Sequence, residues 1–235
     1  MEAAEDLSLG PDELIAAMSP GPAFPAVLRT FEAAFALRPR VIVDLGAGTG
    51  GVSEWLRVTT GATVYAVEPE EGARRAAGRA FPRIHVVEGR ADAAPLPGGV
   101  ADAVVLSGVI SLMTDIDAEL DEVNRLLTRS GSIAIADLFS GTDHTVYAEP
   151  NVFQSVEDLT RILRDNGFAV TERGLGDAEP EPSWAAAAWR VDEWIENRCS
   201  DRPGYLEWRA DRRHLQRHIE SDGLVGGCLV ARRTV

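Results

Sequence analysis

Short apolar, β-branched runs alternate with amphipathic segments along most of the chain. The apolar runs predict strands at 41–43, 62–67, 83–87, 101–106, 132–136, 168–172 and 224–231. Apolar residues at helical spacing predict helices at 12–18, 23–37, 52–57, 70–80, 115–128 and 156–166. Strands that alternate with helices are typical of a parallel α/β sheet with right-handed crossovers.

The segment 176–222 departs from this alternation. After a proline-containing loop at 177–182 it predicts two helices, 184–198 and 205–221, which carry Trp184, Trp189, Trp194 and Trp208. Such a helical pair at the carboxyl side of a sheet is typical of a lid or substrate wall, so the tryptophans would either line a substrate or anchor the pair. We expect one domain over 1–235, with N-terminal helices (1–39), a core (40–175), this helical lid (176–222) and a last strand (223–235).

Composition narrows the possible partners. The 235 residues are 45% hydrophobic, which is typical of a globular protein, and the net charge of −14 disfavours a phosphate-tracking nucleic-acid binder. No apolar run is long enough to span a membrane, and residues 1–7 are acidic, so we expect a cytoplasmic protein without a leader. Cys199 and Cys228 are too few for a disulfide framework or a metal site.

The most informative stretch is 41–51, in which a short strand is followed by closely spaced glycines. Asp44 ends the strand, and Gly46, Gly48 and Gly50 allow the backbone to turn sharply and approach a ligand. The next predicted helix would point its free N–H groups at that ligand. With Glu68 at the end of the second strand, the glycine spacing matches a dinucleotide-binding fingerprint. NAD, FAD and S-adenosylmethionine (SAM) proteins share this pattern, so it does not select a cofactor.

Residues 41–50 closely resemble the first motif of the class I SAM-dependent methyltransferases, including the acid two positions before the first glycine. SAM is cationic and carries no pyrophosphate, so Asp44 suits it better than a dinucleotide. Glu68-Pro69 is similar to the family's ribose-binding position, and 88–93 to its adenine-binding segment. The segment 107–110 after the fourth strand would face the sulfonium. The resemblance extends over about residues 40–140 and includes the helix, turn and strand at 120–133.

This resemblance implies a Rossmann-like, doubly wound, mostly parallel seven-stranded sheet with helices on both faces and an antiparallel last strand. It implies SAM as cofactor and S-adenosylhomocysteine as product. The implied cofactor-binding residues are Asp44, Gly46, Ala47, Gly48, Gly50, Glu68, Pro69, Asp92, Ala93 and Ser107.

Methyl transfer depends mainly on alignment, and a general base is needed when the nucleophile starts as a hydroxyl or a carbon acid. The predicted loop 137–147 opens at the carboxyl edge of the sheet, and its His144 is our candidate catalytic base. Asp137, Asp143 and Tyr147 would orient this histidine or bind substrate. The fourth strand ends in Leu-Ser-Gly without the Asn-Pro-Pro-Tyr type motif of amino-methylating nucleic-acid enzymes, which argues against such a substrate.

A second pair of histidines, His214 and His218, shares one face of the predicted helix 205–221. No third metal ligand is visible in the sequence, so we expect no metal site. The neighbouring arginines would either be solvated or hold a substrate carboxylate or phosphate; they are Arg209, Arg212, Arg213 and Arg217.

The leading hypothesis is a SAM-dependent methyltransferase that acts on the N, O or C atom of a small molecule, in specialised metabolism. The alternatives are an NAD(P)-dependent oxidoreductase that uses the same glycine loop and a non-catalytic SAM-binding protein. Methylation of a basic protein also stays open. The sequence gives no indication of the oligomeric state.

Overall fold

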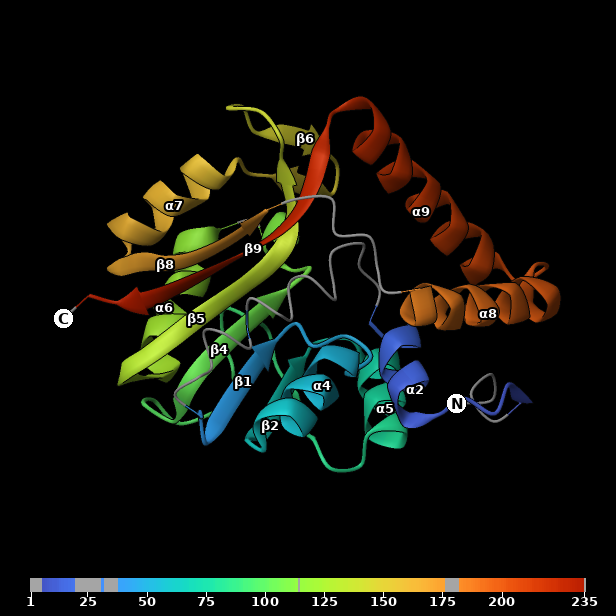
Figure 1. The fold of residues 1–235 in the computed structure, drawn as a ribbon, viewed down its shortest axis with the longest axis horizontal. Helices are drawn as coiled ribbons and strands as arrows, with labels where there is room; N and C mark the ends of the chain where they lie inside the picture. The colour runs from blue at the N-terminus through green and yellow to red at the C-terminus, as the bar shows by residue number, and fades with distance from the viewer. Residues whose placement is uncertain (1–5, 20–30, 32–37, 114, 176–181, 235) are drawn as a thin grey trace.

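A seven-stranded sheet in the order β3-β2-β1-β4-β5-β9-β8 organises the computed structural model, which describes residues 6–19, 31, 38–113, 115–175 and 182–234. The strands β1 to β5 are parallel, and β9 runs antiparallel to both of its neighbours (Figure 1). Their bounds are β1 Val41–Leu45, β2 Thr63–Glu68, β3 His85–Glu88, β4 Ala101–Ser107, β5 Leu127–Ser140, β8 Phe168–Leu175 and β9 Leu224–Arg233. The predicted seven-stranded sheet with an antiparallel last strand is confirmed.

Helices cover both faces of this sheet because alternate residues of the central strands point in opposite directions. One core contains Ile42 of β1 together with residues of α2 (Pro11–Ala17), α4 (Gly51–Thr60) and α5 (Glu71–Ala80). The other contains Val43 and residues of α6 (Ile116–Leu126) and α7 (Val156–Asp165). The central strands are therefore apolar on both sides, which explains their unbroken hydrophobic runs.

The region after β5 differs from the prediction. The loop expected over 137–147 begins later, because β5 continues to Ser140, where it pairs with Leu224 of β9. A short antiparallel hairpin follows, formed by β6 (Val146–Ala148) and β7 (Asn151–Phe153). Strands of three residues are too short for an alternating pattern to reveal, and the extension of β5 depends on a partner strand far away in the sequence.

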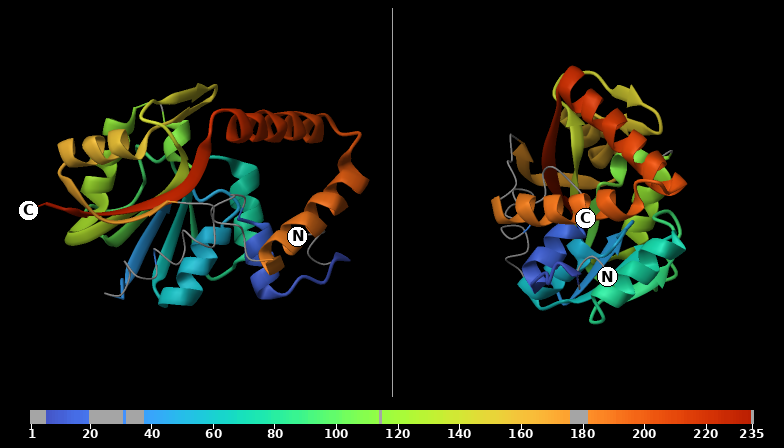
Figure 2. Two further views of the ribbon diagram at one scale, coloured as in Figure 1. Left: turned by 45° about the horizontal axis from the view of Figure 1, so that its top comes forward. Right: turned by 90° about the vertical axis from the view of Figure 1, so that its right-hand side faces the viewer.

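The helical insertion is confirmed as α8 (Pro182–Cys199) and α9 (Pro203–Ser221), which extend from the edge of the sheet (Figures 1 and 2). α8 packs against α2: Arg190 forms an ion pair with Glu13 at 2.9 Å, and the indole of Trp194 donates to Asp6 at 3.2 Å. Trp194 thus anchors the insertion, whereas Trp189 is 64% exposed. The side chains of Trp184 and Trp208 lie outside the described residues.

Of the two predicted N-terminal helices, the first is α2, and the second, over 23–37, lies outside the described residues apart from Phe31. Among the helices that the structure describes, none is long and apolar enough to cross a membrane.

Candidate functional site

The glycine loop joins β1 to α4 at the carboxyl edge of the sheet. Gly46, Gly48 and Gly50 have φ values of 73°, 54° and 83°, a region that other residues rarely adopt. A Cβ atom on Gly46 would lie 2.6 Å from Val109 Cγ2, whereas one on Gly48 would meet nothing within 4 Å. The backbone N–H groups of Gly46 and Ala47 both donate to Val67 O, which ties the loop to the end of β2. The glycines therefore allow the left-handed turns of this loop.

Beneath the loop, Asp44 is a buried acid with an unmet hydrogen bond. Its Oδ2 accepts from the Ser53 hydroxyl at 2.5 Å, while its Oδ1 is buried and has no partner in the described part of the chain. Burial raises the pKa of Asp44 from 3.8 to about 7; the Ser53 hydrogen bond opposes this shift and the nearby Glu68 carboxylate adds to it. Such a carboxyl can be satisfied by a positively charged ligand.

Glu68, the last residue of β2, holds the loop from the other side. Its Oε2 accepts from the backbone N–H of Gly48 at 2.8 Å, and its Oε1 from that of Glu70 at 2.9 Å. Each carboxylate oxygen keeps room for a further donor, so Glu68 can also accept hydrogen bonds from ribose hydroxyls. The neighbouring Pro69 is exposed.

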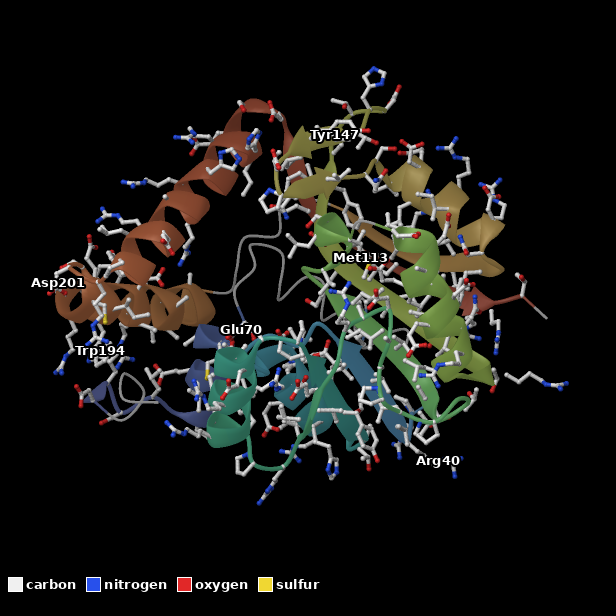
Figure 3. The ribbon with its side chains drawn as sticks, turned by 180° about the vertical axis from the view of Figure 1, so that it is seen from behind. Arg40, Glu70, Met113, Tyr147, Trp194 and Asp201 are labelled. Atoms are coloured by element: carbon white, nitrogen blue, oxygen red, sulfur yellow. The ribbon has the colours of Figure 1, made fainter. Side chains whose placement is uncertain are left out.

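Ser107 ends β4, the strand on the other side of β1, and is half-buried. Asp44, the glycine loop, Glu68 and Ser107 thus lie at the same edge of three adjacent strands. Figure 3 shows this edge from behind: Glu70 and Met113 mark it, and Arg40 lies at the opposite end of the sheet. The structure brings these predicted residues together.

Asp92 and Ala93 lie on the segment after β3 and are engaged within their own turn. Asp92 accepts two hydrogen bonds from Arg90, at 2.9 and 3.1 Å, and the Ala93 N–H donates to Arg90 O at 3.2 Å. The hydrogen bonds from Arg90 lower the pKa of Asp92. A contact of Asp92 and Ala93 with the adenine of the cofactor stays a prediction.

Near the end of β5, Asp137 is half-buried and anchors the loop that follows β4. It accepts hydrogen bonds from the Ser111 backbone and hydroxyl and from the Leu138 N–H, and the Asn151 amide extends this network to the hairpin. Burial raises the pKa of Asp137 from 3.8 to about 6, against the effect of these hydrogen bonds. Sequence reasoning missed Ser53 and Ser111, because no local pattern marks a serine that binds a distant carboxylate.

The predicted base His144 is exposed in the loop between β5 and β6. Its backbone N–H donates to the Thr142 hydroxyl at 3.4 Å, and among the described residues no side chain hydrogen-bonds to its ring. Tyr147 is also 77% exposed. A catalytic role of His144 therefore stays a prediction.

Neither cysteine is bonded to the other; Cys228 is buried and Cys199 half-buried. In the described part of the chain, no group of three His, Cys, Asp or Glu side chains is placed to hold a metal ion.

Comparison with known proteins agrees with this geometry. Residues 43–135 match the family model described as a methyltransferase domain. An uncharacterised methyltransferase of Geobacillus sp. (strain WCH70) is 25% identical over 158 residues, which cover 56% of this chain and 70% of that protein.

Two solved structures share the fold with a TM-score of 0.67 each. One, from Galdieria sulphuraria, is proposed to be a sarcosine dimethylglycine methyltransferase; it is 18% identical, and the match covers 88% of this chain and 84% of that one. The other is the cyclase SpnF, 17% identical, with 87% of this chain and 81% of that one covered.

The strand order and the glycine loop are those of the class I methyltransferase fold, and residues 43–135 match a methyltransferase domain, so the chain is similar to SAM-dependent methyltransferases. The resemblance seen in the sequence is confirmed, and the NAD(P)-dependent oxidoreductase is not favoured.

Proposed function

We propose that the protein transfers the methyl group of SAM to a small-molecule acceptor. The observation that carries this proposal is the buried pair Asp44 and Glu68 beneath the glycine loop of a methyltransferase-type sheet. A buried acid with an unpaired oxygen suits the ammonium and sulfonium of SAM and repels a pyrophosphate. The Galdieria protein, which shares the fold, is named for a small amino-acid substrate.

In this proposal each predicted residue has a physical role toward the cofactor. Glu68 accepts hydrogen bonds from the ribose, Asp44 supplies negative charge beneath the loop, and Ser107 lies beside the reacting methyl. The backbone of Gly46, Ala47, Gly48 and Gly50 would approach the amino-acid part, while Pro69, Asp92 and Ala93 would border the ribose and adenine. SAM brings an activated methyl group, so the chain has to align the acceptor and exclude water.

The fold alone does not fix the reaction, because the cyclase SpnF has a similar one. The acidic charge of the chain favours a small molecule over a nucleic acid. The cytoplasmic location stays a prediction, as does the single-domain division with a helical lid over 176–222.

Titration calorimetry with SAM, S-adenosylhomocysteine and NAD tests the cofactor. We expect S-adenosylhomocysteine to bind with micromolar affinity and NAD not to bind. Binding of NAD alone would overturn the proposal. Incubation with SAM and a library of small acceptors, followed by measurement of S-adenosylhomocysteine, then separates an enzyme from a non-catalytic SAM-binding protein.

A further inference from the structure

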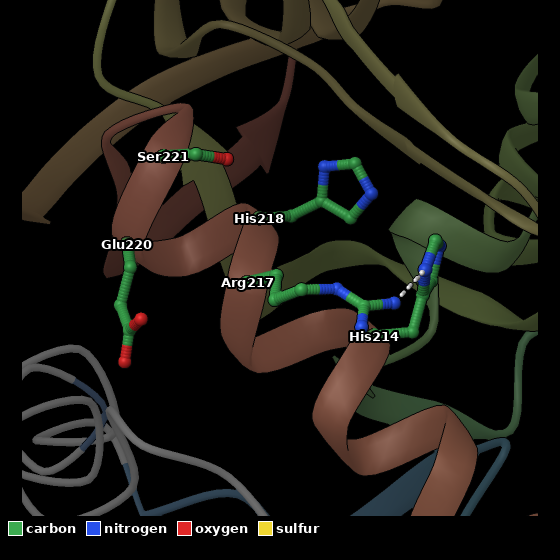
Figure 4. A pocket seen from close by; sticks show the side chains of 5 residues that line it. All are labelled: His214, Arg217, His218, Glu220 and Ser221. Carbon is green, nitrogen blue, oxygen red and sulfur yellow. Dashed lines mark hydrogen bonds between the residues drawn. The ribbon is translucent and has the colours of Figure 1, made fainter.

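The inner side of α9 carries two half-buried histidines next to a cavity. His214 and His218 project from the same side of the helix, whereas the exposed Glu220 points away from them (Figure 4). The open cavity has a volume of about 580 Å³, and its lining residues are His214, Arg217, His218, Glu220 and Ser221. The proposed cofactor residues are not among them.

This cavity lies at the end of the sheet where the cofactor residues lie. β9 starts at Leu224, directly after α9, and Leu224 pairs with Ser140 at the carboxyl end of β5. Ile219 of α9 packs against a small core that contains Leu138 and Phe153. The last turns of α9 are therefore fixed beside the carboxyl end of β5, whose neighbour β4 ends at Ser107.

His218 has the hydrogen-bonded partner that a proton acceptor needs. Its Nδ1 lies 2.5 Å from Asp222 Oδ2, and Asp222 Oδ1 accepts from the Ser221 hydroxyl at 3.0 Å. These two hydrogen bonds lower the pKa of Asp222, so it is ionised and can only accept. The proton of a neutral His218 therefore sits on Nδ1, which leaves a lone pair on Nε2.

His214 has the opposite tautomer. Arg217 lies 3.4 Å from its Nδ1, and because a guanidinium has no acceptor, Nδ1 must carry the lone pair. The proton then sits on Nε2, a buried atom without a hydrogen-bond partner in the described part of the chain. The two rings meet edge to face with centroids 4.6 Å apart. The two adjacent rings thus carry one lone pair, on His218 Nε2, and one N–H without a partner in the described part of the chain, on His214 Nε2.

We propose that His214 and His218 bind the acceptor through a hydroxyl group and that His218 removes its proton, which makes the protein an O-methyltransferase. This inference rests on the proposed function and deepens it. A hydroxyl oxygen has two lone pairs, so it can accept from His214 Nε2–H, donate its proton to His218 Nε2 and still attack the methyl group. A neutral amine has a single lone pair, which the attack would use, and His214 would stay unsatisfied.

The step balances without a further reactant. An oxygen lone pair of the acceptor forms the new C–O bond, and the S–CH₃ bond breaks with its electron pair on sulfur. The hydroxyl proton passes to His218 Nε2 and gives an imidazolium, which the Asp222 carboxylate stabilises. Asp222 is a positioning residue in this step, because it acts through His218.

The first test measures the tautomers by nitrogen-15 NMR of histidine-labelled full-length protein. We expect the Nδ1–H form for His218 and the Nε2–H form for His214, with the Asp222→Asn variant losing the preference at His218. Millimolar phenol, used as a probe, should shift both Nε2 resonances. The opposite tautomers, or no shift with phenol, would overturn the inference.

The second test compares methyl transfer from SAM to matched phenols and anilines. We expect the phenols to be methylated, His218→Ala to lower kcat by about 10²–10⁴-fold, and a smaller loss with 4-nitrophenol, which is already largely ionised. Asp222→Asn should lower kcat with little change in KM. Glu207→Gln, at an exposed position of α9, is the matched control and should behave like the wild type.

The two proposals fail in different ways. Methylation of anilines that is insensitive to His218→Ala would overturn the hydroxyl inference and leave the methyltransferase intact. A wild-type protein that binds neither SAM nor S-adenosylhomocysteine would overturn the proposed function itself.

Discussion

Ser111 binds Asp137 through two hydrogen bonds: its backbone N–H donates to Oδ2 at 3.0 Å and its hydroxyl to Oδ1 at 3.1 Å. The contact joins the 3₁₀ turn η2 (Ile110–Leu112) after β4 to the end of β5. These two neighbouring strands flank the place where the methyl group would be transferred. The position of the loop after β4 thus depends on the half-buried carboxyl group of Asp137.

Ser111→Ala tests this dependence. The change leaves one Asp137 oxygen with fewer donors and the Asn151 amide without its acceptor, so we expect a loss of about 1–2 kcal/mol of stability. The pKa of Asp137 should rise further above 6, because a donor to its charged form is removed. Urea unfolding measures the first effect. Ser130→Ala, at an exposed position, serves as the control, and an equal loss there would contradict the assignment.

Asp44→Asn is expected to stabilise the ligand-free protein and weaken cofactor binding. Folded Asp44 keeps its proton up to about pH 7, whereas the unfolded carboxyl loses it near 3.8, so its contribution lowers stability as the pH rises through this window. At pH 8 the variant should gain on the order of 2–4 kcal/mol over the wild type, and near pH 4 the difference should vanish. Thermal unfolding at several pH values measures the stability difference between the variant and the wild type. A difference that does not change with pH would contradict the raised pKa of Asp44.

The ionisation of Asp44 should also make the affinity for the cofactor depend on pH. A cationic ligand favours ionised Asp44, so binding below pH 7 must release a proton. We expect the affinity for SAM to fall by up to about tenfold per pH unit below 7, and the proton release to disappear in Asp44→Asn. Calorimetry in buffers of different ionisation enthalpy detects that proton directly.

Gly46→Ala tests the close packing and the left-handed backbone of the glycine loop together. A Cβ here would lie 2.6 Å from Val109 Cγ2, and the φ of 73° adds strain, so we expect a loss of about 1–3 kcal/mol and weakened cofactor binding. Gly78 in α5 is the matched control, because a Cβ there meets nothing within 4 Å. Gly78→Ala should stabilise the protein by about 0.4–1 kcal/mol. Similar behaviour of the two variants would contradict this account.

The sequence was sufficient to predict the sheet and the cofactor edge, since both depend on local signals. Buried parallel strands are continuous apolar runs, and Asp44, the glycines and Glu68 follow directly from the ends of two such strands. The pairing of Ser53 with Asp44 was not predictable, because a serine in a helix gives no sign of which side chain it meets.

The same limit applies to the candidate base. The shared face of His214 and His218 follows from helical spacing, but the tautomer of each ring depends on Asp222 and Arg217 in three dimensions. His144 was singled out by its place after β5, and that argument could not reveal that its ring is exposed. A chemical role that depends on contacts between side chains can therefore be assigned only from the folded structure.

Glu68→Gln tests how far the cofactor loop depends on one side chain. The carboxylate accepts backbone N–H groups from both Gly48 and Glu70, whereas an amide offers one acceptor and turns its NH₂ group toward the other donor. We expect the affinity for S-adenosylhomocysteine to fall by about 10–100-fold, because a charge-assisted hydrogen bond contributes about 1.5–3 kcal/mol. Glu172 is exposed on β8, the strand at the far edge of the sheet, so Glu172→Gln is the matched control. If calorimetry gives equal affinities for both variants, Glu68 does not hold the loop for the cofactor.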